Sequence, residues 1–130
     1  MLFVANFYGG TVGEYNATTG AAVKANFIPG LTYYPQKLAV SGNNFFVASD
    51  TGGWIGVYNA ITGALVRPNF TTGLNSVAAL AASGNNLFVA NNTNTVGEYD
   101  ATTGFAIKAN LITTLPTSPG FPYPWTCGVG

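Results

Sequence analysis

The sequence carries very little charge and very little reactive chemistry. Its 130 residues include no histidine, one cysteine, four basic residues and four acidic residues. Charged residues make up 6% of the chain, whereas ordinary soluble domains contain roughly 25%. A net charge of zero supplies no basic surface for a nucleic acid or a membrane surface. No apolar run approaches the roughly 20 residues of a membrane-spanning helix, so we expect neither nucleic-acid binding nor a membrane span.

The missing residue types also exclude the common catalytic arrangements. Without histidine, neither a Ser-His-Asp triad nor a Cys-His pair can form. Cys127 is the only cysteine, so no intrachain disulfide is available. With no base at hand, its thiol is a poor candidate for a reactive thiolate. We therefore expect no enzymatic activity and no cofactor.

Neutral polar residues take the place of charge. The chain has 14 Asn, 16 Thr and 17 Gly, which predicts a polar surface without electrostatic repulsion between copies and so favours self-association. This composition suggests a neutral protein that is extracellular or at the cell surface. Met1 runs straight into an apolar strand pattern at residues 2–5, so either a leader has been removed or the chain is part of a longer protein.

A nine-residue string recurs three times. It reads VGEYDATTG at Val96–Gly104, VGEYNATTG at Val12–Gly20 and IGVYNAITG at Ile55–Gly63. The copies are offset by 43 and 41 residues. A fixed period between about 20 and 50 residues is the signature of repeat architecture.

Each copy predicts four short strands joined by tight turns. The first strand is apolar and rich in aromatic and β-branched residues, which are typical of strands (2–6, 45–49 and 87–91). The nine-residue string predicts a strand followed by an Asx-Gly turn. A cation-bearing strand follows (21–27, 64–70 and 105–111). The last strand (37–41 and 77–83) ends in Ser-Gly-Asn-Asn, a tight-hairpin signal leading into the next copy.

Several of these strands are apolar at consecutive positions, as at 38–40, 45–47 and 87–89. Such strands are covered on both faces of their sheet. Four-stranded antiparallel sheets that repeat about every 42 residues and are covered on both faces predict an all-β fold of β-propeller blades. A solenoid is the alternative, although solenoid coils usually have a shorter period and fewer tight hairpins.

In a propeller the innermost strand usually begins each blade, which sets the predicted division of the chain. Residues 1–118 would form three tandem blades, namely a partial blade at 2–35 and two further blades at 36–75 and 76–118. Residues 119–130 form a divergent segment in which Pro122 and Pro124 cannot donate to a β-ladder. That segment either supplies the missing inner strand of the first blade or is an unrelated tail.

Three blades are too few to close a ring, because propellers have roughly four or more. The free sides of the first and last blades should each expose a large apolar face. We therefore expect a homo-oligomer. Two copies would complete a six-bladed ring, and addition that fails to close would give a fibre.

These motifs resemble a known repeat family. Leu-Phe-Val-Ala-Asn, Thr-Val-Gly-Glu-Tyr-Asp-Ala-Thr-Thr-Gly and Pro-x-x-Leu-Ala-Val-Ser-Gly-Asn-Asn resemble the NHL-type and YVTN-type β-propeller repeats of secreted and cell-surface bacterial and archaeal proteins. The resemblance covers residue 2 to about residue 119. It implies six or seven blades and a role in binding or surface structure.

Exposed aromatic side chains are the best candidates for binding a ligand. Phe7, Tyr8 and Trp54 lie in the variable loop before the nine-residue string. Tyr33 and Tyr34 lie in the connector between the first two copies. Such rings stack on sugar faces or anchor a protein partner. The simpler interpretation, which we favour, is that they pack at blade or subunit interfaces.

The few charged residues fit structural roles. Lys24, Arg67 and Lys108 share one position on the outer strand, where charge protects an exposed edge from strand addition. Glu14 and Glu98 share another position. Two equivalent repeat positions predict a solvated strand face, whereas a catalytic pair would need two different environments.

Metal binding and glycosylation have weaker signals. Asp50 lies in a loop, with Asn91, Asn92 and Asn94 at a related position, but hard cations require more carboxylates than this chain offers. We expect these residues to form Asx turns and expect no metal. Sequons at Asn16, Asn69 and Asn91 would accept glycans only in a glycosylating source.

Three functions remain open from the sequence. The first is a non-catalytic extracellular propeller module with a structural or interaction role, built by self-assembly. The second is a carbohydrate-binding propeller that uses the loop aromatics. The third is a fragment of a larger propeller enzyme whose catalytic residues lie outside this chain.

Overall fold

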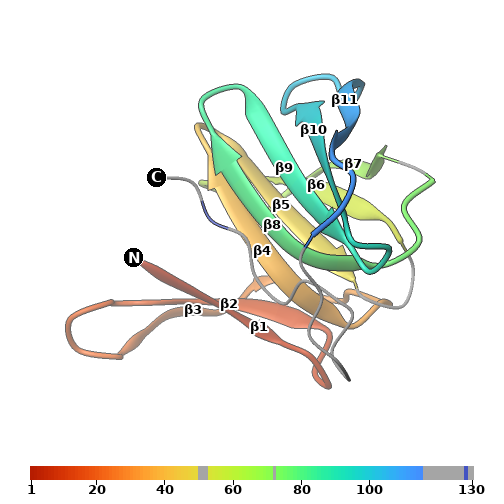
Figure 1. Cartoon of the computed structure of the whole chain (residues 1–130). Helices are drawn as coiled ribbons and strands as arrows, with labels where there is room; N and C mark the ends of the chain where they lie inside the picture. Colours follow the sequence, from red (N-terminus) through yellow and green to blue (C-terminus); the bar gives the residue numbers. More distant parts are fainter. Residues whose placement is uncertain (50–52, 72, 116–127, 129–130) are drawn as a thin grey trace.

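Every element of regular structure in the described part of the chain is a β-strand. The computed structural model describes residues 1–49, 53–71, 73–115 and 128. Their eleven strands form three antiparallel sheets that follow one another along the chain (Figure 1). No helix in these ranges is long and apolar enough to span a membrane.

The sheets follow the predicted order of strands within a repeat. The first contains β1 (Leu2–Asn6), β2 (Thr11–Tyr15) and β3 (Ala22–Ile28) in that order. The second contains β4 (Pro35–Ser41), β5 (Asn44–Ser49), β6 (Ile55–Asn59) and β7 (Leu65–Thr71). The third contains β8 (Val77–Ser83), β9 (Asn86–Asn91), β10 (Thr95–Asp100) and β11 (Ala106–Ile112). The prediction of four-stranded antiparallel units is therefore confirmed for the second and third sheets.

The first sheet has three strands. Within the described residues, β1 is hydrogen-bonded only to β2, so the position that β4 and β8 fill in the other sheets is open. The strand that was expected to fill it, from 119–130, lies outside the described residues apart from residue 128.

The Asx turns form as predicted in all three sheets. The Oδ1 atom of Asn16 accepts backbone N–H bonds from Thr18 and Thr19 at 2.8 and 2.9 Å. Asn59 and Asp100 make the same pair of bonds in the second and third sheets. Each turn ends on a glycine with φ between 73° and 79° (Gly20, Gly63 and Gly104). Only glycine adopts this left-handed conformation without steric cost.

The recurring Gly-x-Tyr has a packing cause. A Cβ on Gly13 would lie 2.6 Å from Cε2 of Tyr15, and one on Gly97 would lie 2.7 Å from Cε2 of Tyr99. The tyrosine ring therefore lies over the bare glycine two residues earlier on the same face of the strand. The pairing with the outer strand shifts register around this glycine in all three sheets. The glycine and tyrosine thus recur as one packing unit.

The core lies between the sheets. Phe45 and Val47 of β5 are buried in a cluster with Val12, Phe27 and Ile28 of the first sheet. The alternate residues of β5 enter a second cluster with the third sheet, which includes Phe46, Ala48, Leu87, Val89 and Tyr99. A strand buried on both faces was predicted from its consecutive apolar residues, and β5 confirms it.

The two outer faces differ, and this corrects one expectation. Leu2 and Val4 of β1 are exposed, as predicted for an uncovered end. On the third sheet, Ala79, Ala90 and Val96 are instead buried, with Phe88 and Leu115 packed against them. The prediction of a fully exposed apolar face was wrong there, because Leu115, which follows β11, packs on that face.

Candidate functional site

The predicted aromatic residues gather into two groups. Phe7 stacks on Tyr34, with ring centroids 4.7 Å apart and planes 19° from parallel, and meets the edge of Tyr8 at 5.0 Å. Tyr33 meets Trp54 edge-on at 4.9 Å. Loop and connector residues that are far apart in sequence are therefore in contact. Tyr8 stays almost fully exposed, at 90%.

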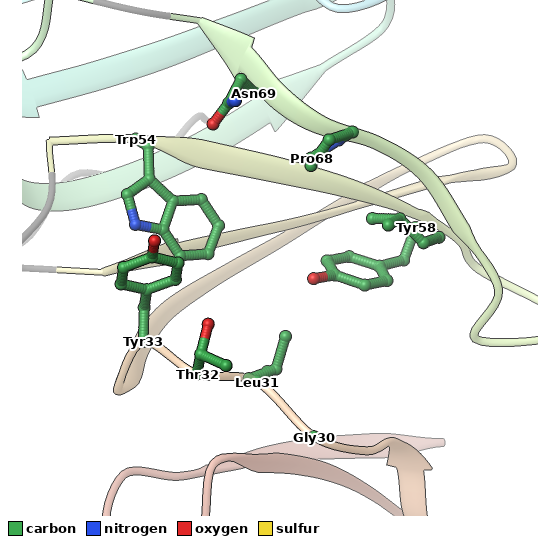
Figure 2. A pocket seen from close by; sticks show the side chains of 9 residues that line it. Gly30, Leu31, Thr32, Tyr33, Trp54, Tyr58, Pro68 and Asn69 are labelled. Carbon is green, nitrogen blue, oxygen red and sulfur yellow. The ribbon is translucent and has the colours of Figure 1, made fainter.

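The second group walls a pocket of about 290 Å³ between the connector at residues 30–33 and the second sheet. Figure 2 shows Tyr33 and Trp54 side by side at one end and the Tyr58 ring at the other, with Asn69 and Pro68 above. The complete lining is Gly30, Leu31, Thr32, Tyr33, Trp54, Tyr58, Leu65, Pro68 and Asn69. The indole Nε1 of Trp54 is buried and has no hydrogen-bond partner among the residues that the structure describes.

The described lining offers ring faces, the hydroxyls of Thr32, Tyr33 and Tyr58, and the amide of Asn69, but no ionisable acid or base other than the tyrosines. Burial raises the pKa of Tyr58 above its usual value, so its hydroxyl is protonated at neutral pH and cannot serve as a base. The same holds for Tyr99, whose pKa burial also raises. The pocket can therefore bind a neutral polar ring by stacking and hydrogen bonding.

A repeated joint links neighbouring sheets. The turn glycine of each later sheet sits against the outer strand of the sheet before it. A Cβ on Gly63 would overlap the carbonyl oxygen of Phe27, and one on Gly104 would overlap that of Phe70. The two joints therefore have the same geometry, one between the first and second sheets and one between the second and third.

Polar contacts reinforce the joint between the second and third sheets. Nη1 of Arg67 donates to the carbonyl of Thr103 at 2.8 Å. Nδ2 of Asn44 donates to the carbonyl of Ala101 at 3.2 Å. The guanidinium also lies 5.6 Å from the ring centroid of Phe70. A second groove, of about 360 Å³, follows this joint and is lined by Arg67, Asn69, Phe70, Thr71, Tyr99, Thr103, Gly104, Phe105 and Ala106.

Arg67 therefore does more than the edge protection predicted for the repeated cations. It reaches across to the next sheet, whereas Lys24 lies over the ring of Phe27 at 5.6 Å. Lys108 lies on β11, and the third sheet is the last one described. Its edge role stays a prediction.

Each end of the array carries one half of the repeated joint. Apart from its two chain neighbours, no described residue has an atom within 4 Å of a Cβ built on Gly20, the turn glycine of the first sheet. Leu111, which occupies the β11 position equivalent to Phe27 and Phe70, is 37% exposed, against 4% and 6% for those two. Sequence reasoning missed this joint. The only signal was the presence of a turn glycine in every copy.

The predicted solvated carboxylate face is wrong for Glu14. Its side chain is only 7% exposed, and Glu98 is half-buried. Both face a lysine across the β-ladder, with Glu14 opposite Lys24 and Glu98 opposite Lys108. These carboxylates are therefore less exposed than the sequence suggested.

Asp100 holds its turn as an ionised group. A backbone hydrogen bond from Thr103 is the largest influence lowering the pKa of Asp100, and bonds from the Thr103 hydroxyl, Thr102 and Asn85 also lower it. The Nδ2 atom of Asn85 donates to Oδ2 of Asp100 at 2.8 Å. This carboxylate therefore has a structural role in the turn of the third sheet.

The three sequons lie in different surroundings. Asn16 is exposed but its Oδ1 is occupied by the turn, and Asn69 is exposed beside the pocket. Asn91 is 8% exposed, and its Nδ2 donates to Oγ1 of Thr95 at 3.5 Å. Asn91 is therefore the least accessible of the three and, as an acceptor, stays a prediction. Asn16 and Asn69 stay predictions.

The described residues that were considered as cation ligands make structural contacts instead. Nδ2 of Asn92 donates to Oγ of Ser76 at 2.9 Å, and Asn94 has a φ of 60°. Asp50 lies outside the described residues. The described residues contain no cluster of three or more His, Cys, Asp or Glu side chains.

Comparisons with solved structures identify the architecture. No family model and no curated protein matches the chain. The WD40 repeats of RRP9 match 83% of this chain with a TM-score of 0.67 at 16% identity. The computationally designed Ika8 protein matches 89% with a TM-score of 0.64 at 24% identity. Hydrazine synthase from Kuenenia stuttgartiensis matches 95% with a TM-score of 0.69 at 14% identity.

These likenesses show the fold alone, because all three identities are below 25%. Together with the three antiparallel sheets, they establish that the chain is built of β-propeller blades. The chain spans about a third of these structures, from 34% to 36% of their own length. The NHL or YVTN subtype stays a prediction.

Proposed function

We propose that this chain is a non-catalytic β-propeller module that acts through blade-to-blade association. The supporting observation is the first sheet. Leu2 and Val4 are 49% and 43% exposed, whereas the equivalent Phe45 and Val47 of the second sheet are fully buried. An apolar face with this exposure favours association with a complementary surface.

Two features support a structural role over a catalytic one. The described carboxylates serve a turn or face a lysine across a ladder. The described tyrosines with a raised pKa are protonated at neutral pH. We further propose an extracellular or cell-surface location, because a surface rich in Asn, Thr and Gly with 6% charge suits a neutral, self-associating surface layer.

The test is the mass of the wild-type chain in solution over a hundredfold range of concentration. Sedimentation should give a species of at least two chains whose population grows with concentration. Electron microscopy of the same sample should separate closed rings from fibres. A stable monomer at the highest concentration would overturn the proposal.

A second candidate is a carbohydrate-binding role, favoured by the pocket between the connector at residues 30–33 and the second sheet. Tyr33 and Trp54 present aromatic surface, and Asn69 supplies an amide at the same site. These are the groups that stack on and hydrogen-bond to a neutral sugar ring. The third interpretation, a fragment of a propeller enzyme, gains no specific support from the described residues.

A glycan array separates this candidate from the first. We expect Trp54→Ala to abolish any sugar signal and Tyr8→Ala to leave it unchanged, because Tyr8 lies outside the pocket. Absence of binding above background by the wild-type chain would exclude the carbohydrate-binding role. Equal loss in both variants would place binding outside this pocket.

A further inference from the structure

We propose that a second copy of this chain docks on the first sheet through its own third sheet, reproducing the joint that links neighbouring sheets within the chain. This inference rests on the proposed association and specifies its surface, direction and partner. The third sheet of one copy would take the place of a sheet preceding the first sheet of the next.

The joint between the second and third sheets is the template. Its earlier sheet contributes the outer strand β7, with Phe70 and Arg67, and its later sheet contributes the turn ending at Gly104. Close approach of the Phe70 carbonyl requires a glycine at that turn. The Arg67 guanidinium then reaches the carbonyl of Thr103, one residue before the glycine.

The joint between the first and second sheets repeats the same close approach. The carbonyl of Phe27 on β3 meets Gly63, and the Phe27 ring is buried among Phe3 and Phe45. Two independent sequence copies thus produce one interface geometry. A third use of it requires only the same two surfaces.

Both halves of the joint are present at opposite ends of the described array. The first sheet offers Gly20 with open space beside it, together with exposed Leu2 and Val4. The third sheet offers β11, where Leu111 and Lys108 hold the positions of Phe70 and Arg67. In the docked pair, the Leu111 carbonyl approaches Gly20 and the Lys108 ammonium approaches the carbonyl of Thr19.

A second copy suits these surfaces better than an unrelated partner. The joint joins an outer strand to a turn glycine, and this chain supplies both halves in the same repeat. The two halves differ from each other, so the contact is head-to-tail. Two such joints between two chains would give six blades, and a series that does not close would give a fibre.

Leu115 covers part of the third-sheet surface that the second copy would contact. It packs on the outer face of the third sheet against Ala79, Ala90 and Val96. The proposed joint is therefore centred on β11, where Leu111 and Ile112 are exposed. Ala90 and Val96 are the repeat equivalents of Ala48 and Ile55, which lie in the core between the second and third sheets. Leu115 therefore has to move aside for the full joint to form.

Complementary blocked variants provide the test. Leu2→Lys blocks the first-sheet surface, and Leu111→Lys blocks the third-sheet surface; both side chains are already partly exposed, so folding should survive. Val66→Lys is the matched control, because Val66 is 60% exposed on the outer strand of the middle sheet. Circular dichroism and thermal melting confirm that each variant is folded, and sedimentation gives its mass.

We expect the control to assemble like the wild type, and each blocked variant alone to have the mass of one chain. An equimolar mixture of the two blocked variants should give a species of twice that mass and no larger one, since one joint remains intact.

Assembly of either blocked variant alone to the wild-type mass would overturn the joint while leaving self-association standing. If Leu2→Lys alone prevented assembly and Leu111→Lys did not, the contact would be a symmetric one between two first sheets, which also contradicts the proposal. A wild-type chain that stays monomeric would overturn both the joint and the proposed function.

Discussion

The first and third sheets have nearly the same sequence and opposite surroundings. Leu2 and Leu87 hold equivalent positions in identical LFVAN strands, yet Leu2 is 49% exposed and Leu87 is fully buried. The difference comes from the second sheet, which covers the face of the third that carries Leu87. Burial in a repeat array is therefore set by the neighbouring sheet as well as by the strand itself.

The largest expected effect tests this difference with one substitution at two places. Leu87→Ala should lower the free energy of unfolding by about 2 to 5 kcal/mol, because it removes a fully buried side chain and leaves a cavity. Leu2→Ala should lower it by less than about 1 kcal/mol, since half of the side chain is already in water. Urea unfolding at a concentration that keeps the chain monomeric measures both.

Equal losses in the two variants would break the comparison, because they would mean that the Leu2 face is covered within a single chain. Repeating the urea unfolding at high protein concentration tests whether association covers the Leu2 face. If copies associate through this face, the cost of Leu2→Ala should rise with concentration and that of Leu87→Ala should change less.

The turn glycines give the next largest effect. Gly20→Ala introduces only the strain of a left-handed alanine, about 1 to 2 kcal/mol, because the space beside it is open. Gly104→Ala adds an overlap with the Phe70 carbonyl and should cost about 1 to 3 kcal/mol more. Thermal unfolding of the monomeric chain compares the two.

Gly42→Ala is the control for backbone strain alone, since Gly42 has a φ of 56° and open space. We expect it to match Gly20→Ala. A Gly104→Ala variant as stable as these two would show that the third sheet does not press on the second at this turn.

The repeated cations should differ more modestly. Arg67→Ala removes an exposed hydrogen bond to Thr103 and should cost about 1 kcal/mol. Lys108→Ala, at the equivalent position on β11, should leave the stability of the monomer within about 0.5 kcal/mol. Chemical denaturation measures both, and a larger loss for Lys108→Ala would reverse the assignment of Arg67 as the cation that joins two sheets.

Much of the fold was predictable because its determinants are local. Asn16 and its equivalents form Asx turns with residues only two and three positions further along the chain. Short hairpin signals in the sequence likewise predict the order of the strands. Predicted strand bounds lay within about two residues, as for β4, which starts at Pro35 where residue 37 was expected.

The candidate site was less predictable because its determinants are distant in sequence. Tyr33 and Trp54 were both chosen as candidates, but nothing local indicates that their rings meet. The burial of Glu14 likewise depends on the packing of whole sheets. The nine-residue string around Gly20 also does not indicate that no outer strand packs beside it among the described residues. The near-identical string around Gly104 has the carbonyl of Phe70 at that place.

The smallest expected effect concerns the one acidic turn residue. Hydrogen bonds hold the pKa of Asp100 below its ordinary value, so this carboxylate stabilises the folded chain at neutral pH. That contribution is present above the unfolded pKa, near 3.8, and is lost as the pH falls through the lower folded pKa. Asn16 holds the equivalent turn of the first sheet with an amide, which does not titrate.

In the Asp100→Asn variant, stability should therefore fall less between pH 5 and pH 2 than in the wild type, as followed by urea unfolding at each pH. The other carboxylates are common to both chains, so they cancel in the difference. At pH 7 the variant should be slightly less stable, because Asn85 now faces an amide donor where it had bonded to Oδ2 of Asp100. Identical pH profiles would mean that the turn of the third sheet, like that of the first, does not depend on ionisation.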